Sequence, residues 1–381
     1  MCQNPNPNSA PNTDPSTSSP ICSPAPAAEE QRRLGDFGKQ ALVQDLARRL
    51  SDADLSARVQ AAREVRKFAR ASAKSRSTFA VEAVVQPLIA MLPSPDRDAR
   101  EAALLALLNL AVRNEGNKDK IVKSGAVPHL VELLRIGKNN LRELATAAVL
   151  TLSASTPNKP TIATSGAVPL LVQILAAGSI QGRVDAVTTL YNLSSCEDST
   201  NFTLPSEAVN PLLTLLKDCK KYSKLAEKTT RLLEILSRTE EGRNLISEFG
   251  GSILTLVETI EEGSLLSAEY AVGVLFSLCS NCREKCRVLI LKEGPIPGLM
   301  LLTAEGTKKA RERAHDLLNL LRDDSKKKRV VSKELEILVY DIATRVDGPM
   351  KAAATAKRIM EDMARRDKEL SATKLHSKGC H

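Results

Sequence analysis

The sequence repeats itself with a period of about 42 residues, and this feature restricts its fold more than any other. The segment Gly125-Ala-Val-Pro-His-Leu130 returns as Gly166-Ala-Val-Pro-Leu-Leu171 and, in degenerate form, as Glu207-Ala-Val-Asn-Pro-Leu212. Successive starts lie 41 to 44 residues apart, and the other copies begin at Ala41, Ala83, Gly251 and Gly294. A fixed period of this size indicates stacked units rather than independent globular domains.

A second landmark follows each start by about 26 residues. In every copy an apolar residue stands one position after the landmark, and another stands two positions before it. A small residue stands six positions before it, except in the last copy, where Ala314 is shifted by one. These spacings place the three residues on one face of a helix, and the small residue allows a neighbouring helix to approach closely. The landmark positions are Lys67, Asn109, Thr151, Asn192, Ile235, Ser277 and Asn319.

Each unit is predicted to hold three helices: a short first helix, a second that begins near the Gly-Ala-Val-Pro motif, and a long third that carries the landmark. Pro at a helix start with Gly just before it fits local backbone preferences. Three helices with this period predict armadillo repeats, and HEAT repeats are the structural alternative. The predicted fold is all-α, a right-handed α-α superhelix (armadillo solenoid) of about seven repeats.

The array occupies only part of the chain. We expect a disordered Pro-, Ser- and Asn-rich leader and the start of the first helix in residues 1–40, because such a composition buries little apolar surface. The array follows in 41–324, with repeat starts near 41, 83, 125, 166, 207, 251 and 294. Residues 325–372 are predicted to form a basic linker and C-terminal capping helices, since an uncapped solenoid end exposes apolar surface. A flexible tail is expected in 373–381.

Composition excludes several functions. Apolar residues make up 43% of the chain and aromatic residues only 3%, so aliphatic layers must form the core. The net charge of +9 is concentrated toward the two ends, and therefore we expect no nucleic-acid partner. No apolar run is long enough to span a membrane. The chain carries none of the common nucleotide-binding or hydrolase motifs, so we predict no enzyme activity and no cofactor.

The stretch 109–213, which includes NLAVRNEGNKDKIVKSGAVPHLVELL, resembles the armadillo arrays of plant U-box ubiquitin ligases and their armadillo-only relatives. The resemblance covers about 41–324 and implies protein–protein interaction in plant signalling, stress or defence. About 40 residues precede the array, so we expect the chain to lack a U-box. Armadillo import adaptors pair Asn with Trp along a groove, and the absence of Trp argues against reception of import signals.

The resemblance also implies that the landmark column lines a concave groove, where Asn hydrogen-bonds the backbone of an extended peptide. Ile235 cannot serve in this way. The alternative interpretation is that the Asn side chains tie neighbouring repeats together. Adding the residues one turn earlier gives the predicted groove residues Arg63, Lys67, Asn109, Thr151, Thr188, Asn192, Arg231, Ser277, His315 and Asn319.

Two further motifs have structural alternatives. Cys279-x2-Cys282-x3-Cys286 has no fourth ligand in a suitable place, so we predict packed thiols and no metal site, with redox sensing as the lesser alternative. Lys326-Lys-Lys-Arg329 fits a nuclear-localisation pattern, and the alternative is a solvated basic linker.

The predicted function is that of a non-enzymatic scaffold or adaptor, which binds other proteins through extended peptide segments held in the groove. The alternative is a substrate receptor or regulator in ubiquitin ligation, with ubiquitin-pathway components as partners. The second alternative is a nuclear cofactor. We expect a cytoplasmic location, and a nuclear one as well if residues 326–329 act as a signal.

Overall fold

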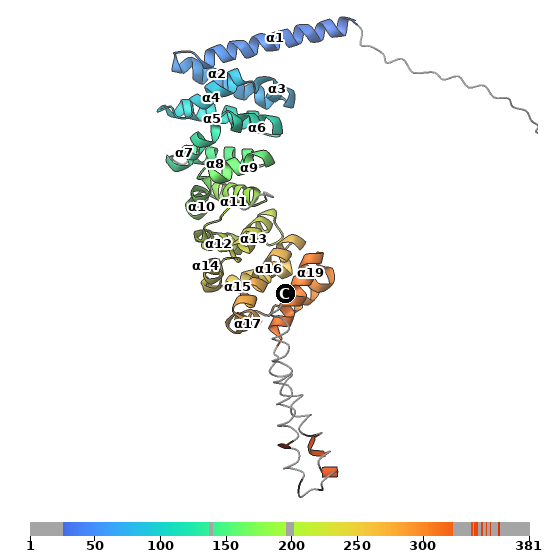
Figure 1. Cartoon of the computed structure of the whole chain (residues 1–381). Coiled ribbons are helices and arrows are strands. Elements are labelled where there is room, and N and C mark those ends of the chain that lie inside the picture. The colour runs from blue at the N-terminus through green and yellow to red at the C-terminus, as the bar shows by residue number, and fades with distance from the viewer. Residues whose placement is uncertain are drawn as a thin grey trace, which may run out of the picture. The chain divides into compact units, whose positions relative to one another are not determined.

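The computed structural model describes residues 26–136, 140–195 and 202–322, with side chains from residue 38 onward, and a few isolated positions between 337 and 358. These residues form helices joined by short turns (Figure 1). The chain divides into two compact units, Met1–Ala208 and Val209–His381. Each unit contains the three kinds of helix that the repeat predicts.

In unit 1 the third helices pack side by side, each against the next along the chain. They are α2 (Leu55–Ala71), α5 (Arg97–Ala111), α8 (Asn140–Ser153) and α11 (Ile180–Ser194). The second helices are α1 (Pro26–Leu50), α4 (Glu82–Ala90), α7 (Ala126–Ile136) and α10 (Ala167–Ala177). The short elements are α3 (Ala73–Phe79), α6 (Glu115–Lys123), η1 (Thr156–Asn158), α9 (Lys159–Thr164) and the final turn η3 (Ser206–Ala208).

Unit 2 repeats the pattern. Its third helices, again packed in sequence, are α13 (Lys224–Leu236), α16 (Leu265–Asn281) and α19 (Lys308–Leu321). The second helices are α12 (Val209–Asp218), α15 (Ser252–Glu262) and α18 (Ile296–Glu305), and the first helices are α14 (Glu240–Glu248) and α17 (Arg283–Lys292). Both units are therefore built of armadillo repeats, and the all-α solenoid fold class is confirmed.

Most second helices begin close to the repeat starts in the sequence: Glu82, Ala126, Ala167, Val209, Ser252 and Ile296 lie one or two residues from 83, 125, 166, 207, 251 and 294. The first one differs, because α1 extends back to Pro26 rather than beginning near 41. Its early part is rich in Ala, Glu, Gln and Arg, which favour helix, so the repeat motif at Ala41 falls inside the helix.

Two local devices set the helix boundaries. Four glycines at the repeat starts adopt φ between 68° and 87°, the left-handed region that a side chain disfavours, and these are Gly125, Gly166, Gly251 and Gly294. Most third helices begin with a side-chain cap that accepts a backbone N–H of the first turn. The capping residues are Asp54, Asp96, Ser179, Ser223, Ser264 and Thr307.

The predicted apolar face is the core of both units. Every small residue of the column before the landmark is fully buried, namely Ala61, Ala103, Ala145, Ala186, Thr229, Ala271 and Ala314. The apolar column two positions before the landmark is buried in all seven copies as well. Burying one such side chain contributes about 1.5–3 kcal/mol, and the small residues allow the third helices to pack closely.

Among the described helices, none is on its own both long and apolar enough to cross a membrane. Thr156–Thr164 and Ala167–Ala177 reach that length and composition only as a pair, and they meet at 86°. Most of the predicted leader, the linker and capping helices of 325–372 and the tail of 373–381 lie outside the described residues.

Candidate partner-binding surface

The predicted groove residues of unit 1 share one face of four neighbouring third helices, which is called the third-helix face below. The two cations on α2 are exposed, whereas the hydroxyl and carboxamide side chains farther along are half-buried. Half-buried polar groups beside exposed cations form a surface that can contact another molecule. The residues are Arg63 and Lys67 on α2, Asn109 on α5, Thr151 on α8, and Thr188 and Asn192 on α11.

The polar side chains of this face already have partners within the unit. The Asn109 side chain donates to the carbonyl oxygen of Leu105 at 2.7 Å, and the Thr151 hydroxyl donates to that of Ala147 at 2.8 Å. Both bonds lie within a single helix. Asn192 instead donates to the Ser153 hydroxyl of the preceding repeat at 3.1 Å, so this side chain ties two repeats. A partner peptide would therefore have to exchange bonds with these groups.

Four cations gather on α2, and we call Arg63, Arg66, Lys67 and Arg70 the basic cluster. They line an open depression of about 420 Å³. Arg63 lies 3.8 Å from the exposed carboxylate of Asp98, which is a weak pair in water. Within the described part of the chain, no ion pair forms at the other three, and the buried Nε of Arg66 has no hydrogen-bond partner. The cluster thus presents positive charge that unit 1 itself does not neutralise.

Aliphatic and aromatic side chains lie beside the polar column of unit 1. Leu105 and Leu108 of α5, Leu150 of α8 and Tyr191 of α11 are all half-buried. These side chains retain accessible apolar surface, which gives up water favourably when a partner covers it. The third-helix face of unit 1 therefore combines apolar surface, polar groups and a basic end.

In unit 2 the corresponding positions differ from one helix to the next. The Ser277 hydroxyl of α16 donates to the carbonyl oxygen of Ser237 at 2.6 Å, which is a bond between repeats. Asn319 and His315 of α19, both exposed, contact each other at 3.1 Å. Ile235 of α13 is half-buried and has no polar group to offer.

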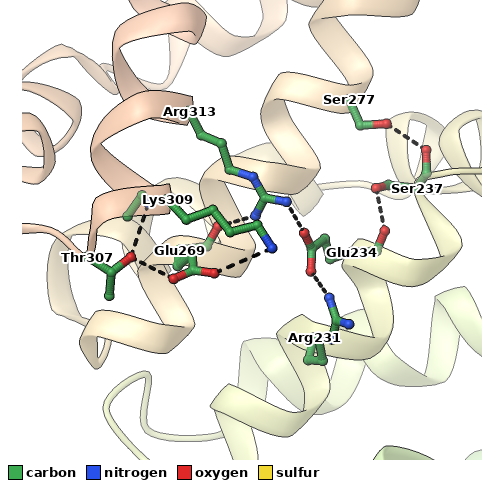
Figure 2. Close-up of polar contacts among 9 residues, drawn as sticks. Arg231, Glu234, Ser237, Glu269, Ser277, Thr307, Lys309 and Arg313 are labelled. Atoms are coloured by element: carbon green, nitrogen blue, oxygen red, sulfur yellow. Dashed lines mark hydrogen bonds and ion pairs between the residues drawn. The ribbon is translucent and has the colours of Figure 1, made fainter. Parts of the chain in front are cut away.

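Arg231, the remaining predicted groove residue, takes part in a network that crosses three third helices (Figure 2). Its guanidinium group donates to Glu234, which lies on the same helix and is only 3% exposed. The second oxygen of Glu234 accepts from Arg313 of α19. Arg231 also lies over the ring of Tyr270 at 5.4 Å. We call Arg231, Glu234 and Arg313 the Glu234 network.

A second carboxylate supports this network from α16. Glu269 accepts from the Thr307 hydroxyl at 2.6 Å, and its backbone carbonyl oxygen accepts from Arg313 at 3.2 Å (Figure 2). Lys309 lies 3.9 Å from the same carboxylate. The two terminal nitrogens of Arg313 are thereby bonded to two different helices, Nη1 to α16 and Nη2 to α13.

Gly273 on α16 makes room for Arg313 to reach Glu234. A Cβ at this position would lie 2.7 Å from Nη1 of Arg313 and 3.1 Å from Oε1 of Glu234. The arginine passes over α16 where that helix has no side chain. Residues 79 positions apart in the sequence are joined in this way.

Sequence reasoning did not identify Glu234, Glu269 or Arg313. One signal was available, since Arg231 and Glu234 are three residues apart on a helix and form a common ion-pair spacing. The participation of Arg313 had no local signal, because it depends on the register between α13, α16 and α19. Gly273 stands one turn before the landmark Ser277, and nothing in the sequence marked it as a passage.

The remaining predicted motifs contribute little to this surface. Cys279 and Cys286 are buried free thiols, and Cys282 is an exposed one. Within the described residues, no group of three or more His, Cys, Asp and Glu side chains is arranged to hold a metal ion. The predicted nuclear-localisation run Lys326, Lys327, Lys328 and Arg329 lies outside the described residues.

Comparison with known proteins places this repeat array among plant proteins. Residues 43–341 match the family described as the plant U-box protein ARM repeat region. From Arabidopsis thaliana, U-box domain-containing protein 45 is 32% identical over 141 residues, which is 37% of this chain and 18% of that protein. U-box domain-containing protein 25 of the same plant is 31% identical over 36% of this chain and 32% of its own length. The alignments thus span only about a fifth to a third of these relatives.

Solved structures give the same fold at low sequence identity. An engineered protein of known crystal structure has a TM-score of 0.55 and 23% identity, with 83% of this chain and 77% of that chain covered. A structure described in terms of the interaction between cadherin and beta-catenin has a TM-score of 0.64 and 17% identity, with 75% and 54% covered. These likenesses concern the fold alone.

Proposed function

The chain belongs to the plant U-box protein ARM repeat family, and from this premise we propose that it is a non-catalytic scaffold that holds a segment of a partner protein on the third-helix face of unit 1. The observation that supports the proposal is the basic cluster on α2 at the end of a half-buried polar and apolar surface. Armadillo folds provide repeated binding surfaces of this kind.

The chemistry of the face favours an extended segment with acidic residues. The cations at Arg63, Lys67 and Arg70 can pair with carboxylates, while the apolar side chains of α5 and α8 can cover aliphatic parts of the segment. Asn109 and Thr151 offer a carboxamide and a hydroxyl to peptide groups. A segment held in this manner needs no fold of its own before binding.

A defined probe tests this proposal. We expect a fluorescein-labelled peptide of alternating Glu and Ala to bind the full chain at least about tenfold more tightly than a Lys and Ala peptide, as charge complementarity requires. The double variant R63E/K67E should lose that preference. Lys123→Glu on α6 is the control for charge reversal elsewhere on the surface, because Lys123 is exposed and lies off the third-helix face. Fluorescence anisotropy gives the affinities, and equal binding by R63E/K67E and wild type would refute the proposal.

The natural partner can then be sought with the same variants. Proximity labelling in plant cells should recover a set of proteins with the wild-type chain and with Lys123→Glu, and lose part of that set with R63E/K67E. Asn109→Ala should weaken the same proteins to a smaller extent, since it removes one polar group from the face. A set that does not depend on these residues would place the partner site elsewhere on the molecule.

A role in ubiquitin ligation is the second candidate, and the U-box relatives motivate it. In this function the array would select the substrate or regulate a ligase. A reaction with activating enzyme, conjugating enzyme, ubiquitin and this chain should yield no ubiquitin chains, whereas addition of a U-box ligase should reveal any regulatory effect. Chain formation without added ligase would contradict the proposal that the chain is non-catalytic.

We propose that the chain acts in the cytoplasm and, if Lys326–Arg329 is a working signal, in the nucleus as a cofactor of a nuclear partner. The sequence of this basic run motivates the proposal. A fluorescent fusion in which the four residues are replaced by Ala should lose nuclear signal relative to the wild-type fusion. An unchanged distribution would dismiss this run as a signal.

A further inference from the structure

Three cysteine thiols lie together where α16 meets α17. Cys279 belongs to the last turns of α16 and is fully buried, and Cys286 in α17 is 4% exposed. Cys282 is the residue between the two helices and is exposed. An accessible thiol and a buried one thus lie four residues apart in the chain, and both are free.

An open depression of about 330 Å³ leads to this pair. Cys282 and Cys286 line it together with Arg243, Lys285 and Glu240. Two cations against one carboxylate leave the surroundings positive, and Cys282 lies at the N-terminal end of α17, where the helix dipole also favours negative charge. The depression thus gives a small oxidant access to the exposed thiol of Cys282.

We propose that Cys282 and Cys286 form an oxidation site, at which hydrogen peroxide converts the two thiols into an intramolecular disulfide. In the first step the thiolate of Cys282 attacks one peroxide oxygen, the O–O bond breaks, and the released hydroxide takes a proton to become water. In the second step the sulfur of Cys286 attacks the resulting sulfenic acid, and the expelled hydroxide takes the Cys286 proton as a second water. The two thiols lose two electrons, and the peroxide gains them.

The two cysteines have different roles in this reaction. Burial raises the pKa of the Cys286 thiol above its ordinary value, and burial does the same for Cys279. Both therefore remain protonated near neutral pH and react slowly with peroxide. Cys282, the exposed member, makes the first attack, and Cys286 resolves the sulfenic acid because it lines the same depression one turn away.

The backbone brings these two positions within one turn of each other. The backbone N–H of Cys286 donates to the carbonyl oxygen of Cys282 at 3.0 Å. Cβ atoms one helical turn apart are about 5–6 Å from each other, and a disulfide needs about 3.5–4.5 Å. The bond therefore requires the first turn of α17 to shift, and Cys282 stands at the end of that helix in a non-helical conformation.

Peptide mapping of the full-length protein tests the proposal. Trypsin cuts after Arg283 and Lys285, which separates Cys282 from Cys286. After brief treatment with hydrogen peroxide and alkylation of the remaining thiols, we expect residues 244–283 to be linked to residues 286–287, and dithiothreitol should release them. A wild-type protein in which Cys282 is instead oxidised to the sulfinic or sulfonic acid, or links two chains, would overturn the proposal.

Variants separate the three thiols. Cys282→Ser should abolish the link and, because this residue is exposed, should keep the helicity of the wild type. Cys286→Ala should leave a sulfenic acid at Cys282 that a dimedone probe traps. Cys279→Ala should still form the link, and Cys219→Ser is the matched control at a distant half-buried thiol. A link that persists in Cys282→Ser, or disappears in Cys279→Ala while helicity is kept, would assign the reaction to Cys279 and refute the proposed pair.

Discussion

Arg63 and Arg231 occupy the same position of the repeat, one turn before the landmark, but they have opposite surroundings. The Arg63 side chain is 51% exposed and has only a distant, exposed partner in Asp98. Arg231 is 24% exposed and is bonded to the buried carboxylate of Glu234. The two helices differ at the position three residues after this arginine, where α2 carries Arg66 and α13 carries Glu234. The cation stays exposed in the repeat that lacks a carboxylate at this position and is bonded within the fold in the repeat that has one.

Removal of the buried carboxylate of Glu234 should cause the largest change, a loss of stability in unit 2. Glu234→Gln leaves Arg231 and Arg313 without their shared charge partner. We expect a loss of about 2 kcal/mol in stability, less than the 3–5 kcal/mol of fully buried pairs, because both arginines are partly exposed. Urea unfolding followed by far-UV circular dichroism measures it. Glu262→Gln at an exposed position of α15 is the control, and equal midpoints for both variants would mean that the network adds nothing.

The repeat in which Arg63 is exposed can be given the carboxylate that accompanies Arg231 in the other repeat. In Arg66→Glu the new carboxylate stands three residues after Arg63, as Glu234 stands after Arg231. We expect the affinity for the Glu and Ala peptide to fall about tenfold, since close charge contacts at exposed sites contribute up to about 1 kcal/mol each. Anisotropy with Lys123→Glu as the charge-matched control checks this. If both variants lose affinity equally, net charge explains the binding and the position of Arg66 does not.

Gly273 offers a test in which one substitution should have different effects on stability in two backgrounds. Gly273→Ala should cost about 1 kcal/mol in the wild-type background, because the added Cβ displaces Arg313 and this outweighs the gain in helix propensity. In an Arg313→Ala background the closest obstacle is absent and only Oε1 of Glu234 remains nearby, so the same substitution should cost much less or be neutral. Urea midpoints of the four proteins give this double-mutant cycle. Additive effects would show that Gly273 does not serve as the passage.

The smallest effect concerns a partly exposed ion pair in unit 1, between Arg49 and Glu64. Arg49 donates to both oxygens of Glu64, at 2.9 and 2.7 Å, and this hydrogen bonding lowers the pKa of Glu64 below its ordinary value of 4.5. A lowered pKa stabilises the fold above pH 4.5, and that stability is lost as the pH falls through the folded-state pKa.

Glu64→Gln should therefore cost about 0.5 kcal/mol at neutral pH, because solvent screens this partly exposed pair. The difference from wild type should vanish at acid pH, which thermal unfolding at several pH values can measure. A difference that persists below the folded-state pKa would assign the effect to packing rather than to charge.

The repeat unit and its core follow from the sequence because they depend on local spacing. Ala103 and Leu107, for example, stand four residues apart on one face of α5, and both are buried. The left-handed corner at Gly166 follows from the residue type. Each of these features is decided within one helix or one turn, where periodicity is informative.

The hydrogen-bond partners of the landmark side chains could not be predicted in the same way. Asn109 bonds to its own helix, whereas Asn192 bonds to the preceding repeat, although both are Asn at the same repeat position. The choice depends on what the neighbouring helix presents, here the hydroxyl of Ser153. The Glu234 network depends in addition on Gly273 of α16, where the absence of a Cβ lets Arg313 reach Glu234. Such partners are set by packing between repeats, which a single sequence does not encode in its spacing.

Arg313 also changes how unit 2 is expected to unfold. A solenoid usually behaves as a one-dimensional chain, in which each repeat is stabilised only by its immediate neighbours and the ends can fray one repeat at a time. A side chain that joins α19 to α13 across α16 adds a coupling to the second neighbour. The last repeat can then separate only by giving up a bond two repeats away. These three third helices should therefore open as one cooperative block, with the passage at Gly273 as its cause.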